Sequence, residues 1–289
     1  MEMVERRRGK KTRVTVLLIA ICVAFLSFFE LPDIFGGGLV FHAFDVGQGD
    51  SFLFRFPNAS TMLVDAGPKK NGKELVRKLR KLGVRRIDVL VATHPHEDHI
   101  GGMTEVIKAF PVGKIWDSGY NHGSATQRAM LKLVEEKKIR FGRPRAGFIQ
   151  KFDDVSVEVL APVKTISGTG SDANNNSIVL LVSFKKISFL MTGDMEKPER
   201  RSIGRFPHAT VLKLAHHGSA DATDRRMLEQ IRPEIGIISC ARENPYGHPH
   251  KKTLRLLADF GVKVYETHDG EIVIRTDGEK YVLKRRGGK

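Results

Sequence analysis

Cysteine, internal repeats and long apolar runs are scarce in this sequence, and each shortage narrows the range of protein classes. The 289 residues include two cysteines, Cys22 and Cys240, in separate apolar contexts, so no disulfide framework is expected. No repeat or low-complexity tract occurs, which argues against a solenoid. One long uncharged apolar stretch, residues 14–29, occurs, so these residues cannot hold a multi-span membrane domain. We also find no Arg-rich stripe with interleaved aromatic residues, and expect no dedicated nucleic-acid motif.

Acidic residues are outnumbered by basic ones. The formal net charge is +15, from 48 Lys and Arg against 33 Asp and Glu. A basic body favours polyanionic partners such as nucleic acid or anionic wall polymers, although a solvated basic surface would have the same composition. The apolar fraction of 41% is enough for a substantial core in one large domain or two small ones.

The N-terminal region has the composition of a membrane-targeting segment. Six Lys and Arg lie within residues 6–13, directly before the uncharged residues 14–29. A helix of that length rises about 24 Å, a little less than the ~30 Å of a hydrocarbon core. We expect an uncleaved single-pass anchor whose basic flank stays cytoplasmic, which leaves the catalytic body extracytoplasmic. Secretion after signal cleavage is the alternative. The expected division is 1–38 for flank, anchor and linker, and 39–289 for the catalytic domain.

Hydrophobic periodicity predicts an α/β (α+β) protein with two sheets packed face to face and helices outside, an αββα sandwich. Helices are expected at 73–82, 103–110, 125–138, 224–231 and 251–260. Strands are expected at 39–46, 51–56, 61–65, 87–92, 114–117, 155–159, 178–184, 187–191, 211–215, 235–239, 262–265, 272–275 and 280–284.

Residues 94–99 concentrate potential metal ligands. His94, His96, Asp98 and His99 follow an apolar strand and precede a glycine pair. Side chains two apart in an extended segment point the same way, so His94 and His96 can converge on one ion. Asp98 and His99 lie past the bend and can face a second ion. Imidazole and carboxylate ligands suit zinc, manganese or iron.

This pattern resembles the second motif of the metallo-β-lactamase-fold hydrolases. Further segments resemble, in order, the C-terminal hydrolase-like domain of the DNA-uptake proteins of the ComEC family: 44–51, 65–67, 192–194, 216–219 and 246–250. The resemblance spans about residues 40–284. It implies a metal-dependent hydrolase, whereas the substrate is less certain because this fold carries many chemistries.

The resemblance also implies a ligand set for two divalent ions, Zn or Mn. It assigns His94 and His96 to the first ion, Asp98 and His99 to the second, and Asp194 as the bridge. A late histidine completes the second site. His248 is expected in that role, and His250 or His217 could take its place.

One segment departs from the wider family. Many members place a third histidine on the first ion, but the corresponding stretch here contains Asn176 and Ser177, as in the ComEC-like branch. The first ion would keep two imidazoles and a bridging carboxylate. Oxygen ligands and water favour a harder ion, so manganese becomes as plausible as zinc.

Other side chains are expected around the ions. Asp98 is expected to be catalytic as well as a ligand, and His217 is expected to donate a proton to the leaving group. Asp65 is expected to orient the histidine loop by accepting an imidazole N–H. Substrate or supporting contacts are expected from Asn176, Ser177, His216 and His250, and structural or surface roles from His42, His122, His208 and His268.

The resemblance therefore implies an extracytoplasmic phosphodiesterase, most of all a DNA nuclease, that uses a metal-activated water. The expected partners are DNA or another anionic phosphodiester, the membrane through the N-terminal helix, and the DNA-uptake machinery. One alternative is a small-substrate phosphodiesterase similar to phosphorylcholine esterases. Another is a non-catalytic DNA-binding or assembly module, which would have little use for Asp98, Asp194 and the late histidine together.

Overall fold

The computed structural model describes residues 37–287. The expected anchor and its alternative, a cleaved signal, fall on residues 1–36 and so lie outside the described part. Within residues 37–287, no helix is both long enough and apolar enough to cross a bilayer.

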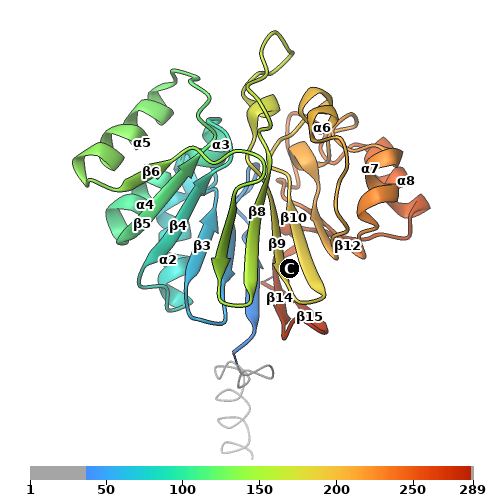
Figure 1. The fold of residues 1–289 in the computed structure, drawn as a ribbon, viewed down its shortest axis with the longest axis horizontal. Coiled ribbons are helices and arrows are strands. Elements are labelled where there is room, and N and C mark those ends of the chain that lie inside the picture. The colour runs from blue at the N-terminus through green and yellow to red at the C-terminus, as the bar shows by residue number, and fades with distance from the viewer. Residues whose placement is uncertain (1–36, 288–289) are drawn as a thin grey trace, which may run out of the picture. The chain divides into compact units, whose positions relative to one another are not determined.

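The chain from Gly38 onward forms two mixed sheets that face each other (Figure 1). One sheet has eight strands, in the order β15 (Tyr281–Arg286), β14 (Glu271–Thr276), β1 (Leu39–Ala43), β2 (Phe52–Arg55), β3 (Thr61–Val64), β4 (Ile87–Ala92), β5 (Val112–Asp117) and β6 (Arg140–Gly142). The other has seven, in the order β13 (Lys263–Glu266), β12 (Ile235–Ile238), β11 (Val211–Lys213), β10 (Ile187–Met191), β9 (Val179–Phe184), β8 (Val155–Ala161) and β7 (Ile149–Phe152).

Helices cover the outer face of each sheet, which confirms the predicted αββα layers. The outer face of the eight-stranded sheet packs in one apolar cluster with α2 (Gly72–Lys81), α3 (Glu97–Ile100), α4 (Met103–Ala109) and α5 (Ala125–Glu136). The seven-stranded sheet is covered by α6 (Lys197–Ile203), α7 (Arg225–Ile231) and α8 (Lys251–Asp259). Four short 3₁₀ helices are also described: η1 (Lys69–Asn71), η2 (Asn174–Asn176), η3 (Ala215–Gly218) and η4 (Thr267–Asp269).

The core between the sheets is centred on three phenylalanine rings. Phe41 of β1 and Phe54 of β2 are 4.9 Å apart between ring centroids. Phe189 of β10 lies 5.1 Å from Phe41 and 5.5 Å from Phe54. Because strand side chains alternate between faces, these rings all point inward and join the two sheets, as does Phe52, two residues before Phe54 on β2.

Most predicted elements occur within a few residues of their expected bounds, and Ser124 caps α5 as predicted by accepting a hydrogen bond from the Gln127 amide at 3.1 Å. Four helices and strands were missed: α3, which lies within the expected ligand loop, α6, β6 and β7. Strands β6 and β7 are short, and most of their residues are exposed rather than apolar and buried. The start and stop signals of α6 were present, namely Pro198 in its first turn and Gly204 at φ 76° after its end.

Parallel strands position the polar loops. Strands β3, β4, β5 and β6 run parallel, as do β10, β11, β12 and β13. The carboxyl ends of parallel strands share one edge of a sheet, and ligand sites commonly form there. The loops after β3 and β4 therefore come from one sheet, and those after β10, β11 and β12 from the other.

The buried histidine His42 makes an acid-sensitive contribution to stability. Burial, together with the charges of Arg286, Arg55 and Arg275, lowers the pKa of His42 to about 3. Below pH 6.5 the unfolded chain therefore binds a proton that the folded chain does not, so stability falls as the pH falls.

We predict that this group removes about 2 kcal/mol of unfolding free energy between pH 7 and pH 5. His42→Phe should flatten the pH dependence by that amount in urea unfolding, since the new ring stays neutral beside Phe44. His208→Phe, at an exposed position, is the control. An unchanged slope in the His42 variant would contradict the assignment.

Candidate metal centre

Asp194 is the central group where the polar loops of the two sheets meet. It follows β10 and is buried. Its Oδ2 lies 3.3 Å from Nε2 of His99 and 3.3 Å from Nε2 of His217. Nε2 of His94 is 3.8 Å away and Nε2 of His216 is 3.9 Å away. Asp194 thus occupies the central position expected for a bridging carboxylate.

Asp65 fixes the orientation of His99. Nδ1 of His99 lies 2.8 Å from Oδ2 of Asp65, and both groups are fully buried. Thr93 also donates to this carboxylate, from its amide to Oδ1 at 2.9 Å and from its hydroxyl to Oδ2 at 2.6 Å. Because an ionised carboxylate only accepts, Nδ1 of His99 carries the hydrogen and Nε2 is left facing Asp194. This is the arrangement expected of Asp65.

A backbone carbonyl fixes the orientation of His217 in the same way. Nδ1 of His217 donates to the Ser239 carbonyl at 2.7 Å, directly after β12. Nε2 then faces Asp98 Oδ2 as well as Asp194 Oδ2, at 3.3 Å from each. The backbone of His217 has a φ of 54°, in the left-handed region, which turns its ring back toward the site.

The Nε2 atoms of His99 and His217 fit a cation. Both are buried and have no hydrogen-bond partner among the described residues. Burial lowers the pKa of each imidazole, but the surrounding carboxylates, Asp194 first among them, together outweigh burial and raise both pKa values well above the ordinary range. The carboxylates therefore stabilise positive charge beside these nitrogens. A divalent ion would supply that charge while the imidazoles stay neutral.

The types of ligand atom in this cluster also suit a divalent metal ion. Ligand atoms of Asp50, His99, Asp194 and His217 all lie within 4.8 Å of one another. Two imidazoles and two carboxylates are suited to zinc, manganese or iron. Divalent metal ions therefore fit this cluster.

The expected first-ion pair lies next to this cluster. His94 Nε2 is 3.2 Å from His96 Nδ1 and 3.8 Å from Asp194 Oδ2. Burial and the neighbouring His99 lower the pKa of His94 well below its ordinary value. A neutral imidazole is the form that binds metal. The structure thus brings both histidines to the same side of Asp194.

Lys213 is a buried cation at this site that the sequence reasoning missed. Its Nζ lies 2.5 Å from Asp50 Oδ2 and 3.6 Å from Asp194 Oδ1, and donates to the Gly193 carbonyl at 2.9 Å. Burial opposes its charge, but Asp50 and Asp194 raise its pKa above the ordinary value. The sequence signal for a buried cation was a lysine inside the otherwise apolar run 211–215. Asp50, to which we had assigned no role, is its partner.

Asn176 and Ser177 support the backbone around Asp194. The Asn176 side chain bonds to both backbone groups of Ile166 and to the Asp172 carbonyl, so it holds the preceding loop. The Ser177 hydroxyl accepts from the Asp194 amide at 3.2 Å. These contacts of both side chains are to backbone groups.

A cavity of about 360 Å³ lies over this cluster. It is lined by Gln48, His96, Asp98, Gly170, Ser171, Asn174, Asp194, Glu196, His216, His217, Tyr246 and His248. Asp98 is half-buried there, and His99 and His217 hold the pKa of its carboxyl far below the usual range despite burial. The lining is mostly polar, which suits an ionic substrate.

Of the late histidines, His217 lies nearest Asp194 in these contacts. The His248 ring is 6.1 Å from the His217 ring and 5.5 Å from the His216 ring, on the cavity wall. Burial lowers the pKa of His248 to about 4, so it is neutral at pH 7. His250 instead accepts a hydrogen bond from the Ala220 amide at 2.9 Å.

Two residues outside this set also have defined surroundings. Cys240 is fully buried, with Sγ 3.7 Å from His268 Nδ1. Burial and Glu266 raise the pKa of this thiol to about 12, which disfavours the thiolate that binds metal. His122 was expected to lie apart from the site, but its ring is 5.4 Å from that of His96.

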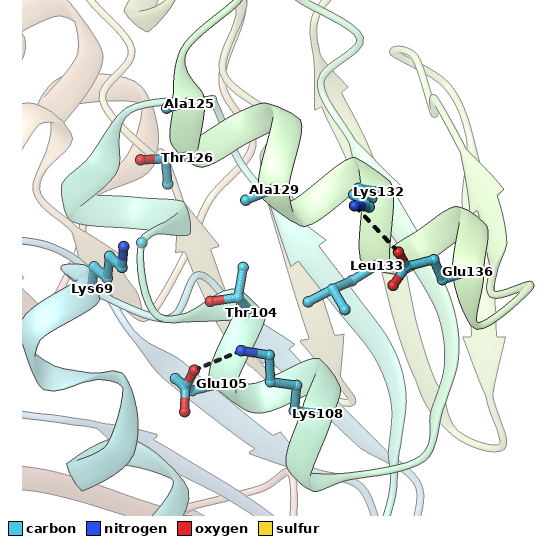
Figure 2. A pocket seen from close by; sticks show the side chains of 11 residues that line it. Lys69, Thr104, Glu105, Lys108, Ala125, Thr126, Ala129, Lys132, Leu133 and Glu136 are labelled. Carbon is cyan, nitrogen blue, oxygen red and sulfur yellow. Dashed lines mark hydrogen bonds and ion pairs between the residues drawn. The ribbon is translucent and has the colours of Figure 1, made fainter.

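A second cavity, of about 530 Å³, lies between α4 and α5 and contains none of the expected ligands (Figure 2). Its charged side chains are largely paired: Lys108 lies 3.1 Å from Glu105, and Lys132 lies 3.8 Å from Glu136. The chemistry-bearing residues therefore belong to the cavity over Asp194.

Sequence comparison places this site in a known family. The model of the metallo-beta-lactamase superfamily matches residues 44–242. ComE operon protein 3 of Bacillus subtilis is 29% identical over 266 residues, covering 85% of this chain and 34% of that protein. Competence protein ComA of Neisseria gonorrhoeae is 30% identical over 228 residues, covering 77% of this chain and 30% of that protein. The chain thus spans about a third of the length of these relatives.

Solved structures show the same fold. CmlA, a diiron beta-hydroxylase from Streptomyces venezuelae, matches with a TM-score of 0.55 and 14% identity over 83% of this chain and 54% of that one. The metallo-beta-lactamase fold protein YhfI from Bacillus subtilis matches with a TM-score of 0.54 and 13% identity over 79% of this chain and 96% of that one. The chain belongs to the metallo-beta-lactamase superfamily, as a metal-dependent hydrolase fold homologous to the ComEC-type competence proteins.

Proposed function

We propose that this domain is a metal-dependent phosphodiesterase whose substrate is DNA. The observation that carries the proposal is the convergence of two oriented imidazoles, His99 and His217, on the buried Asp194 carboxylate. The polar cavity above them and the net charge of +15 suit a phosphodiester anion. Relatives named for competence and recombination support DNA as that anion.

The ligand groups would hold two ions on either side of Asp194. His94 and His96 form one group, and Asp98, His99 and His217 form the other. Zinc or manganese bound there would supply an activated water and a clamp for the phosphate oxygens. Asp65 and the Ser239 carbonyl keep His99 and His217 in the tautomer that presents Nε2.

We propose His216, rather than the expected His217, as the proton donor. With Nδ1 on the Ser239 carbonyl, His217 has only Nε2 left, and that atom faces the ligand carboxylates. His216 lines the cavity, and its Nδ1 lies 3.4 Å from Glu196 Oε1. With Nδ1 beside Glu196, Nε2 is the ring nitrogen on the Asp194 side, 3.9 Å from Oδ2, and would face a substrate bound there.

The predicted anchor at residues 14–29 would place this chemistry outside the cytoplasm. That location remains a prediction, as does contact with the DNA-uptake machinery. A small diester fits the 360 Å³ cavity too, so the experiments below include one as a substrate.

Metal removal and reloading test the proposal directly. We expect the full chain, stripped with chelator and reloaded with Mn²⁺ or Zn²⁺, to cleave DNA and bis-p-nitrophenyl phosphate. Asp194→Asn should lower both activities at least about 100-fold and reduce bound metal measured by mass spectrometry, because the central ligand loses its charge. Asp221→Asn, at an exposed carboxylate, is the matched control. If only the small diester is cleaved, the substrate is a small phosphodiester rather than DNA. If the protein binds no metal, the proposed metal site is refuted.

The role of His216 can be separated from metal binding by the leaving group. His216→Gln should lower DNA cleavage about 100-fold or more, because an alkoxide leaving group needs a proton. Cleavage of bis-p-nitrophenyl phosphate should fall far less, since nitrophenolate leaves without one. Bound metal should stay at the wild-type level. Equal losses on both substrates would contradict a proton-donor role.

The Lys213–Asp50 pair should dominate the stability of the site. Lys213→Met leaves two buried carboxylates without their cation, which should cost about 3–5 kcal/mol of unfolding free energy in chelator. Adding Asp50→Asn should recover much of that loss. Lys252→Met removes an exposed lysine paired with Asp221 at 3.2 Å and should change stability by less than about 1 kcal/mol. A small effect of Lys213→Met in urea unfolding would show that another group neutralises the negative charge of Asp50 and Asp194.

A further inference from the structure

Residues 137–152 form an unusual surface, which we name the basic edge. It contains six cations, Lys137, Lys138, Arg140, Arg143, Arg145 and Lys151, and no acidic residue. None of these cations forms an ion pair with another residue in the range 37–287 that the structure describes. Phe141 and Phe148 lie among these cations, so this segment is a short local exception to the general lack of an Arg-rich stripe with interleaved aromatic residues.

Apolar side chains are exposed among these cations. Phe141, Phe148 and Ile149 are 38%, 41% and 53% exposed, and they are half of the six large hydrophobic side chains exposed in the described residues. Single exposed hydrophobic residues are ordinary, but a cluster on one short segment indicates a binding surface.

The exposed rings are held in place. The Phe148 ring meets the buried Trp116 ring edge to face, with centroids 5.5 Å apart. The Arg143 guanidinium lies 5.6 Å from the Phe141 ring centroid. The rings are therefore positioned before any partner binds, which lowers the entropy cost of binding.

The basic edge crosses from one sheet to the other. It contains β6, the last strand of the eight-stranded sheet, and β7, the last strand of the seven-stranded sheet. Figure 1 shows this segment passing from β6 beside α5 to the strands next to β8. Open sheet edges with apolar side chains are normally avoided in proteins, so their retention here calls for a partner.

One loop connects the basic edge to the metal centre. Arg145 donates to the Ser118 carbonyl at 3.0 Å, and a side chain at Gly119 would meet both Arg143 and Arg145 at 3.0 Å. The same loop carries His122, whose ring lies 5.4 Å from His96. Residues 118–122 thus contact the basic edge through Arg145 and the cavity-lining His96 through His122.

We propose that the basic edge binds single-stranded nucleic acid and leads it to the metal centre. The alternation of cations with flat rings matches the alternation of phosphates and bases in a single strand. A duplex would offer phosphates to the arginines but keep its bases stacked away from Phe141 and Phe148. A protein partner is less well matched, because the centre of a protein interface is poor in charge. The proposal rests on the proposed phosphodiesterase function, whose substrate it specifies.

Binding of fluorescein-labelled dT20 to the full chain, measured by anisotropy with chelator present, tests this without turnover. Phe141→Ala with Phe148→Ala keeps every charge and should weaken dT20 binding at least about tenfold, since each stacked base contributes strongly. A duplex of the same length should lose far less. Equal losses for strand and duplex would overturn the single-strand assignment.

A charge variant provides the second test. Arg140→Gln, Arg143→Gln and Lys151→Gln together should lower the slope of log affinity against log salt by about 2, from three lost phosphate contacts. The matched control removes three exposed cations of α8, Lys251→Gln, Lys252→Gln and Arg255→Gln. An equal loss in the control, or wild-type binding in both basic-edge variants, would overturn the proposal. Because binding is measured with chelator, a failure of hydrolysis would refute the proposed function and leave this result standing.

Discussion

Compensation of buried negative charge is the constraint on which this site depends. Asp50, Asp98 and Asp194 converge within a few ångströms of two imidazoles, and Lys213 is the buried cation among them. Isolated charges are too costly to bury, so such a cluster forms only where opposite charge is supplied. Lys213 supplies part of it permanently. The remainder must come from protons on His99 and His217 or from divalent metal, which ties folding of the site to what it binds.

The two parallel half-sheets make this convergence possible. Asp65 and His99 come from loops after β3 and β4, whereas Asp194, His217 and the Ser239 carbonyl come from loops after β10, β11 and β12. Packing of the Phe41, Phe54 and Phe189 rings holds the sheets together beneath these loops. His99 and His217 therefore each have an orienting partner from their own sheet.

Local sequence was informative where the chemistry is local. His94 to His99 lie within six residues, so their spacing predicted a ligand loop, and the family resemblance added Asp65 and Asp194. Lys213 and Asp50 are 163 residues apart (213 minus 50), and their contact depends on how the two sheets face each other. Hydrophobic periodicity within each strand does not predict how the two sheets are placed relative to each other. The choice of His217 over His248 beside Asp194 likewise depends on a left-handed backbone turn after β11. Strands β6 and β7 escaped prediction because their exposed, basic residues lack the apolar alternation of a buried strand.

The position of Lys213 also bears on how the two ligand groups differ. Its ammonium faces Asp194 Oδ1, so only Oδ2 is directed toward the histidines. The group with His99 and His217 keeps Asp98 as a second carboxylate, whereas His94 and His96 have no other carboxylate in these contacts. The two groups would therefore offer an ion different ligand charge, with fewer carboxylates beside His94 and His96 than beside His99 and His217.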